Sequence, residues 1–177
     1  MNIIFLDIDG VVATPLTVLA YPQNGKIWSI DPTLIKAVGQ LAWDTDSKIV
    51  LSSTWRTHHN FCTWHDMMCA FQIGNTMYNE SNPVAEGEPR SNEEPVWRTP
   101  DGKFSGFRGH EVKAWLDECI EKRHNVEHYV ILDDDSDFLE EQQRFLVKTD
   151  GMIGLTYNDY RKARAILRGV EENDDND

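Results

Sequence analysis

The 177-residue sequence lacks several features that would assign it to particular classes of protein. No apolar run approaches the roughly 20 residues that a membrane-spanning helix needs, so we expect no membrane association. The N-terminus carries neither a basic leader nor a cleavage signal, which favours a cytoplasmic location. No internal repeat is visible, and the length suits one domain with a sizeable core.

Cysteine is also scarce, with only Cys62, Cys69 and Cys119. Their number is odd and their spacing matches no metal-binding motif. This pattern argues against a disulfide-rich extracellular scaffold and against a structural zinc site. We therefore expect reduced thiols that lie in the hydrophobic core.

Basic residues are few: the chain has 17 Lys and Arg residues and 30 Asp and Glu residues, which gives a formal net charge of −13. An acidic surface repels a long nucleic acid, so we expect no extended nucleic-acid binding. A small phosphorylated substrate that meets a metal ion and one or two basic residues is compatible with this charge. Five of the acids lie in segment 170–177, which we expect to be a disordered tail after a single domain at 1–169.

What the sequence does contain is an apolar segment, 2–6, that runs directly into Asp7, Asp9 and Gly10. Alternation places the two aspartates on the same side of an extended strand. Two such charges repel each other and usually need a cation between them. Gly10 lets the backbone turn sharply and approach a ligand. The segment predicts a metal-dependent phosphoryl-transfer site; the competing interpretation is a strand end with solvated aspartates in a turn.

Two further apolar runs end in polar side chains of the same kind. Segment 48–51 is followed by Ser52 and Ser53, and segment 129–132 is followed by acids from Asp133 onward. In parallel sheets, ligands bind at the carboxyl ends of the strands. If the three runs are parallel neighbours, their polar ends meet at one edge.

The remaining chain predicts an α/β fold, with a Rossmann-like central parallel sheet flanked by helices. Helical spacing is expected over 32–42 with Asp31 as N-cap, over 54–71, over 109–122, and from a cap at Asn158 or Asp159 to Leu167. Further short strands are expected at 145–147 and 152–155. Irregular segments are expected at 11–31, as a flap loop, and at 72–107, as an insertion with a hairpin near 96–104.

Taken in order, these motifs resemble those of the haloacid dehalogenase (HAD) superfamily of phosphohydrolases. The Asp-x-Asp-Gly motif stands at 7–10, the strand that ends in Ser or Thr at 49–52, and the apolar strand that ends in acids at 130–134. The superfamily also places a basic residue shortly before the last of these strands. Arg108, in an Arg-Gly-x-x-Val pattern that opens a helix, and Lys113, inside that helix, both qualify, and we favour Arg108.

A closer resemblance is to the small, nearly capless HAD-like domains of multi-enzyme RNA repair proteins and phage proteins. Those domains share the pattern Ser-Ser-x-Trp-Arg, here at 52–56. They also share Arg-Gly-x-Glu-Ile/Val-x-x-Trp-Leu, here at 108–116.

The resemblance implies a Mg²⁺-dependent phosphomonoesterase that acts on a nucleotide or on the terminal phosphate of a nucleic acid. It implies that Asp7 forms an aspartyl-phosphate and that Asp9 acts first as acid and then as base. The implied metal ligands are Asp7, the backbone carbonyl of Asp9, and Asp133, with Asp134 or Asp137 acting through water or by orienting a ligand. The implied phosphate-binding groups are Ser52 with Ser53 as the adjacent candidate, Arg108 or Lys113, and backbone amides near 8–10.

Several other assignments remain open at this stage. Arg56 lies one turn past the two serines and either faces the substrate or forms a salt bridge at the helix start. The aromatic residues Tyr21, Trp28 and Trp97 either stack on a base or fix loops to the core. A catalytic role is also considered for His58 and His59, and a substrate contact for His110. The competing functions are a phosphoprotein phosphatase and a non-catalytic interaction module that keeps the fold.

Overall fold

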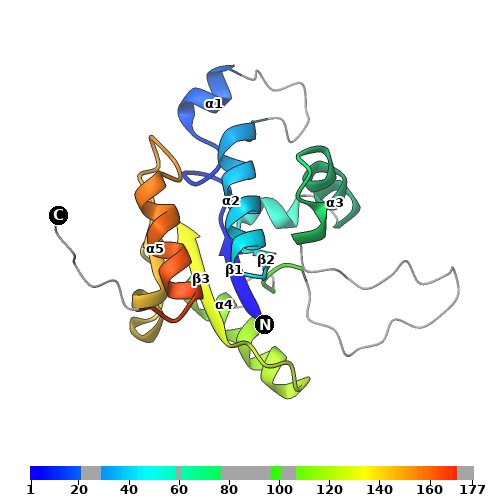
Figure 1. The fold of residues 1–177 in the computed structure, drawn as a ribbon, viewed down its shortest axis with the longest axis vertical. Coiled ribbons are helices and arrows are strands. Elements are labelled where there is room, and N and C mark those ends of the chain that lie inside the picture. Colours follow the sequence, from blue (N-terminus) through cyan, green and yellow to red (C-terminus); the bar gives the residue numbers. More distant parts are fainter. Residues whose placement is uncertain (21–28, 59–60, 77–96, 101–106, 171–177) are drawn as a thin grey trace, which may run out of the picture.

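Four parallel strands form the centre of the computed structural model (Figure 1). They are β1 (Asn2–Leu6), β2 (Ser47–Leu51), β3 (His128–Asp133) and β4 (Leu146–Lys148), and they lie in the order β2-β1-β3-β4. The structure describes residues 1–20, 29–58, 61–76, 97–100 and 107–170. The α/β fold with a central parallel sheet is thereby confirmed, and no cap domain is present among the described residues.

Strand β1 is covered on both faces and paired along both edges. Ile3 and Phe5 pack toward α4 (Arg108–Glu121), whereas Ile4 and Leu6 pack into the core on the opposite face. A strand that is buried on both faces needs an unbroken apolar run. The two aspartates therefore follow β1 only where it leaves the core.

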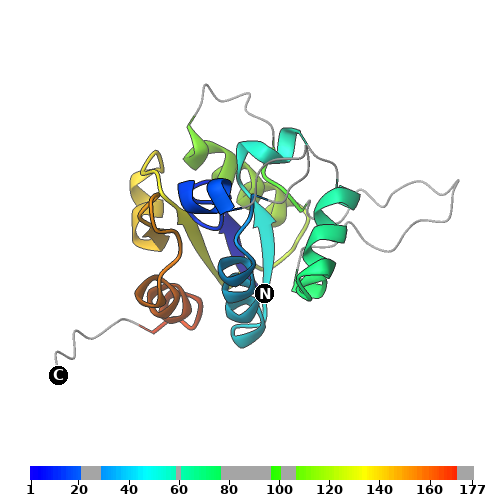
Figure 2. The same ribbon diagram turned by 90° about the horizontal axis from the view of Figure 1, so that it is seen from above.

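Helices cover the two faces of the sheet in separate layers (Figure 2). On one face lie α2 (Pro32–Asp44) and α5 (Tyr157–Leu167), and on the other lies α4. The start of α2 is as predicted, because the Asp31 side chain accepts hydrogen bonds from the backbone N–H groups of Thr33 and Leu34. Pro32 occupies the first turn, where its missing N–H costs nothing.

The predicted helix over 54–71 is divided into two elements. A 3₁₀ turn, η1 (Thr54–Thr57), comes first, and α3 (Phe61–Ala70) follows it. Trp64 and Met68 of α3 are buried, and the side chain of Phe61 lies outside the described residues.

The cysteines were predicted to be core thiols, and one of them is not. Cys119 of α4 is fully buried, and burial raises the pKa of its thiol to about 12. Cys69 is exposed, because it lies on the outer face near the end of α3. The side chain of Cys62 lies outside the described residues.

The two segments predicted to be irregular contain some regular structure. The flap segment includes the short helix α1 (Pro15–Ala20), and the insertion includes the 3₁₀ turn η2 (Gly74–Thr76). Trp97 to Thr99 run beside the end of β2: the N–H of Leu51 donates to Trp97 O, and the N–H of Thr99 donates to Leu51 O. The described residues therefore show a short parallel pairing with β2. A hairpin was predicted near 96–104, and residues 101–106 of that segment lie outside the described residues.

Two predictions near the C-terminal end were wrong. Segment 152–155 is a turn rather than a strand, because Gly154 has a φ of +80° and its N–H donates to Asp150 O. Helix α5 is capped by Thr156 rather than by Asn158 or Asp159, and Asp159 instead completes a capping box from the third helical position. The 3₁₀ turn η3 (Glu140–Phe145) leads into β4, which confirms the strand expected there.

Within the part of the chain that the structure describes, no helix has both the length and the apolar character needed to cross a membrane.

Candidate active site

Three strand ends meet at one edge of the sheet. In the register of β1, β2 and β3, the last residue of β1 lies level with Leu132 of β3. Asp7, Ser52 and Asp133 come directly after that level, and the backbone N–H of Asp7 donates to Leu132 O at 2.9 Å. Segments that are far apart in the sequence therefore bring these three side chains to the same edge, as the sequence predicted.

The acids at this edge form a tight group. Asp7, Asp133 and Asp134 each offer a carboxylate oxygen, and these oxygens all lie within 4.8 Å of one another. The first two side chains are buried, with exposed fractions of 1% and 0%. Buried carboxylates this close are strongly unfavourable unless positive charge compensates them. The group is therefore stabilised by a cation, by a basic side chain or by protonation of one of its carboxylates.

Arg108, at the start of α4, supplies one of those positive charges. Its Nη1 lies 2.9 Å from Oδ2 of Asp7 and 2.6 Å from Oδ2 of Asp133. Burial lowers the pKa of Arg108, but the two carboxylates together raise it above its ordinary value, so the guanidinium stays charged. Burial raises the pKa of Asp133 to about 7, with a further contribution from Asp7, and Arg108 offsets only part of this.

The donor set of the group fits a hard divalent cation such as Mg²⁺, because its three side chains offer carboxylate oxygens and neither nitrogen nor sulfur. Oδ1 of Asp7 is buried and accepts no hydrogen bond from any described residue. A buried acceptor without a donor is costly, so this oxygen is suited to a ligand from outside the chain.

Two glycines make room for Asp134. A side chain at Gly10 would place its Cβ 2.3 Å from Cγ of Asp134, and Gly10 also has a φ of +70°. A side chain at Gly151 would place its Cβ 2.5 Å from Oδ2 of Asp134. Only glycine fits these contacts without displacing the carboxylate. The role of Gly151 was not anticipated, since nothing in the sequence links it to the acids.

Asp9 lies apart from the three-acid group and is exposed. Its Oδ2 accepts a hydrogen bond of 2.8 Å from Nε1 of Trp55. Partial burial raises the pKa of Asp9, and the charges of Asp7 and Asp134 act in the same direction, whereas the bond from Trp55 lowers it. A carboxyl group with a raised pKa is suited to carry a proton.

The adjacent serines after β2 have different surroundings. Ser52 Oγ is buried and has no hydrogen-bond partner among the described residues. Ser53 Oγ accepts a hydrogen bond from the backbone N–H of Trp55 and caps η1. Ser52 is therefore the hydroxyl that remains available for a ligand.

Arg56 is a structural residue, and of the two alternatives that the sequence left open the structure shows the salt bridge. Its side chain is buried, and Nη2 pairs with Oε2 of Glu111 at 2.7 Å. Nη1 donates to the carbonyls of Ser52 and Ser53, while Nε and Nη2 donate to those of Thr99 and Pro100, so all five N–H groups have acceptors in the protein. The partner of Arg56 in this salt bridge, Glu111, lies on α4.

Of the two candidate basic residues, the structure brings Arg108 to the acids. Lys113 lies on the outer face of α4, where it forms an exposed pair with Asp117 at 2.6 Å. Asp137 is not part of the three-acid group: its side chain and backbone carbonyl accept hydrogen bonds from the N–H groups of Arg108 and Gly109. Asp137 thus caps the helix that carries Arg108, and a metal-binding role for it stays a prediction.

The remaining candidate groups are a backbone amide, three aromatic residues and three histidines. The backbone N–H of Gly10 donates to Ala13 O at 2.8 Å, so it is committed within the turn. Trp97 is buried, which fits a loop anchor rather than a stacking surface. Tyr21, Trp28 and His59 lie outside the described residues, while His58 and His110 are exposed.

Sequence reasoning missed the roles of Trp55 and Glu111. Trp55 lies in the pattern at 52–56, and Glu111 lies in the pattern at 108–116. No local sequence signal indicates that Trp55 binds Asp9 or that Glu111 binds Arg56. Their partners are 46 and 55 residues away in the chain.

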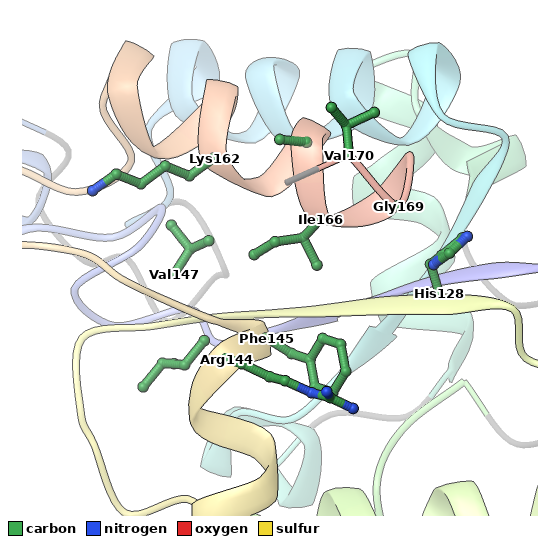
Figure 3. Close-up of a pocket in the computed structure, with 10 residues that line it drawn as sticks. His128, Arg144, Phe145, Val147, Lys162, Ile166, Gly169 and Val170 are labelled. Atoms are coloured by element: carbon green, nitrogen blue, oxygen red, sulfur yellow. The ribbon is translucent and has the colours of Figure 1, made fainter. Parts of the chain in front are cut away.

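A separate groove of about 520 Å³ lies between α5 and β4 (Figure 3). It is lined by basic and apolar side chains, including His128, Arg144 and Lys162, and by none of the acids described above. The groove is therefore distinct from the acidic edge.

The family model described as "HAD domain in Swiss Army Knife RNA repair proteins" matches residues 3–160 of the chain. The matched range includes the carboxyl ends of all four strands and every residue of the acidic edge. No curated protein and no solved structure matches the chain.

Proposed function

The chain belongs to the family of HAD domains in Swiss Army Knife RNA repair proteins, and from this premise we propose that it is a Mg²⁺-dependent phosphomonoesterase. Its substrate is a nucleotide or a phosphorylated nucleic-acid end, in keeping with the repair of RNA that the family description names. The observation that carries the proposal is the convergence of Asp7, Asp133 and Asp134 within 4.8 Å, with Arg108 bridging two of them.

In this proposal Asp7 is the nucleophile. Its unbonded Oδ1 attacks the phosphorus, the bond from phosphorus to the leaving oxygen breaks, and an aspartyl-phosphate forms on Asp7. Asp9 gives a proton to the leaving oxygen. Asp9 then takes a proton from the water that hydrolyses the intermediate, which returns both residues to their starting states.

Other side chains hold the phosphate. The hydroxyl of Ser52 and the guanidinium of Arg108 stand at the same edge as Asp7 and can donate to the equatorial oxygens. Asp7, Asp133 and Asp134, with the backbone carbonyl of Asp9, would hold Mg²⁺. When bound, Mg²⁺ supplies charge neutralisation between the carboxylates and the phosphate.

The test is phosphate release from a panel of mononucleotides and of 5′- and 3′-phosphorylated oligonucleotides, with Mg²⁺ and with EDTA. We expect turnover that depends on Mg²⁺ and is lost by at least about 10³-fold in Asp7→Asn, which keeps the shape of the side chain but removes the nucleophile.

Circular dichroism and thermal unfolding of Asp7→Asn provide the control for folding. Retained activity in this folded variant would exclude aspartyl catalysis. No turnover of any ester by wild-type protein that binds Mg²⁺ would favour the non-catalytic module, and turnover of phosphopeptides alone would favour the phosphoprotein phosphatase.

A further inference from the structure

The indole of Trp55 is the group that fixes the position of Asp9. Asp9 is exposed and lies after the end of β1, where an aspartate side chain is otherwise free to rotate. The bond from Nε1 of Trp55 to Oδ2 of Asp9 measures 2.8 Å. Because an indole N–H donates and never accepts, it binds whichever carboxyl oxygen lacks the proton.

Trp55 is itself held firmly in place. Its ring packs against the core beside Trp64, with 6.5 Å between ring centroids. Its backbone N–H is bound by Ser53 Oγ, and the next residue, Arg56, is anchored to Glu111 of α4. The donor therefore sits on an anchored turn, η1, which begins two residues after Ser52.

We propose that Trp55 is a positioning residue, which occupies one carboxyl oxygen of Asp9 so that the other oxygen carries the proton toward the leaving group. This inference rests on the proposed function. When the leaving oxygen departs, the proton passes from the free carboxyl oxygen of Asp9 to that oxygen, and the bond from Trp55 stabilises the carboxylate that remains.

The first test compares two substrates in Trp55→Phe. An alcohol such as a nucleoside leaves slowly without a proton, whereas p-nitrophenolate leaves readily without one. We expect single-turnover release of the nucleoside to slow by about 10- to 100-fold, and release of p-nitrophenol to change by less than about threefold. Equal slowing of both substrates, or no change in either, would overturn the inference.

A matched variant separates the hydrogen bond from packing. Trp55→His keeps a five-membered ring with an N–H at the corresponding position but loses the larger ring, whereas Trp55→Phe keeps more apolar volume and loses the donor. We expect the His variant to be the less stable of the two in thermal unfolding and yet the faster on the nucleotide. A faster Phe variant would show that only packing matters. Trp115→Phe, on the opposite face of the sheet, should leave the ratio between the two substrates unchanged.

A double variant shows whether Trp55 acts through Asp9. In an Asp9→Asn background, Trp55→Phe should change the release of phenol from phenyl phosphate by less than about twofold, because residues that act as a unit are not additive. A further large loss would refute the inference. If wild-type protein turned over no phosphomonoester, the proposed function would fail first, whereas normal turnover in Trp55→Phe would reject only the role of Trp55.

Discussion

At the scale of single residues, the site contains buried polar atoms that have no hydrogen-bond partner among the described residues. Neighbouring polar atoms of the same type do have such partners. Ser52 and Ser53 are neighbours of the same type, and both are buried. The hydroxyl of Ser52 has no partner among the described residues, while that of Ser53 accepts the N–H of Trp55. A buried hydroxyl without a partner is unfavourable for folding, so the hydroxyl of Ser52 is suited to bind a ligand from outside the chain.

We therefore expect substitution of Ser52 to affect catalysis and substitution of Ser53 to affect stability. Ser52→Ala should lower kcat/KM for phosphate release by about 10²-fold with little change in Tm, since it removes a donor to the phosphate and no bond within the protein. Ser53→Ala should lower the free energy of unfolding by about 1 kcal/mol, because it removes the cap of η1. Steady-state kinetics and urea denaturation of both variants provide the comparison, and identical profiles would contradict it.

At the scale of elements, the Arg56–Glu111 pair joins the turn after β2 to helix α4. Both side chains are nearly buried, with exposed fractions of 4% and 11%. Glu111 lies one turn after Arg108 on the same helix, so the pair also sets where Arg108 meets the acids. The segment at 97–100 joins this contact through the carbonyls of Thr99 and Pro100.

Removal of Glu111 should therefore be costly. Glu111→Ala leaves a buried guanidinium unpaired, and we expect the free energy of unfolding to fall by about 3 kcal/mol. Asp117→Ala breaks the exposed pair with Lys113 on the same helix and should cost less than about 0.5 kcal/mol. Denaturant unfolding of the two variants measures the difference. A small effect of Glu111→Ala would mean that the pair contributes little to joining the two elements.

At the scale of the whole molecule, the acidic edge links the stability of the fold to pH. The ordinary pKa of Asp133 is 3.8, and burial together with Asp7 raises it to about 7 in the folded protein. Between these values the folded state binds a proton that the unfolded state does not bind. The contribution of Asp133 to stability is therefore complete at low pH and declines as pH rises toward 7.

Mg²⁺ should reverse this trend, because it binds ionised carboxylates. We expect the Tm of metal-free protein to fall between pH 5 and 7.5 by more in the wild type than in Asp133→Asn. Excess Mg²⁺ should raise the wild-type Tm by about 5 °C at pH 8 and by much less at pH 5.5. Thermal unfolding across pH, with and without Mg²⁺, provides the measurement. An equal shift at both pH values, or the same shift in Asp133→Asn, would contradict binding at this group.

Predictions from sequence failed where the outcome depended on packing around a turn. Residues 152–155 have the apolar character of a strand, yet Leu155 donates its N–H to Val11 O and Gly154 adopts a left-handed conformation. For Arg56, the distance from the serines left substrate contact and a salt bridge equally open, and the sequence did not identify the partner. The five N–H groups of Arg56 donate to acceptors that include Glu111, which is 55 residues away. No local sequence pattern predicts these partners.

The sequence by itself determined that the apolar runs of β1, β2 and β3 become buried strands and which residues stand at their ends, because a strand that is covered on both faces must be apolar until it leaves the core. It also determined the start of α2, since Asp31 and Pro32 act locally. Only the tertiary structure decided that Arg108 rather than Lys113 meets the acids and that Trp55 binds Asp9. These choices depend on sheet register and on the rotation of α4 about its axis, which arise from contacts between residues that are far apart in the chain.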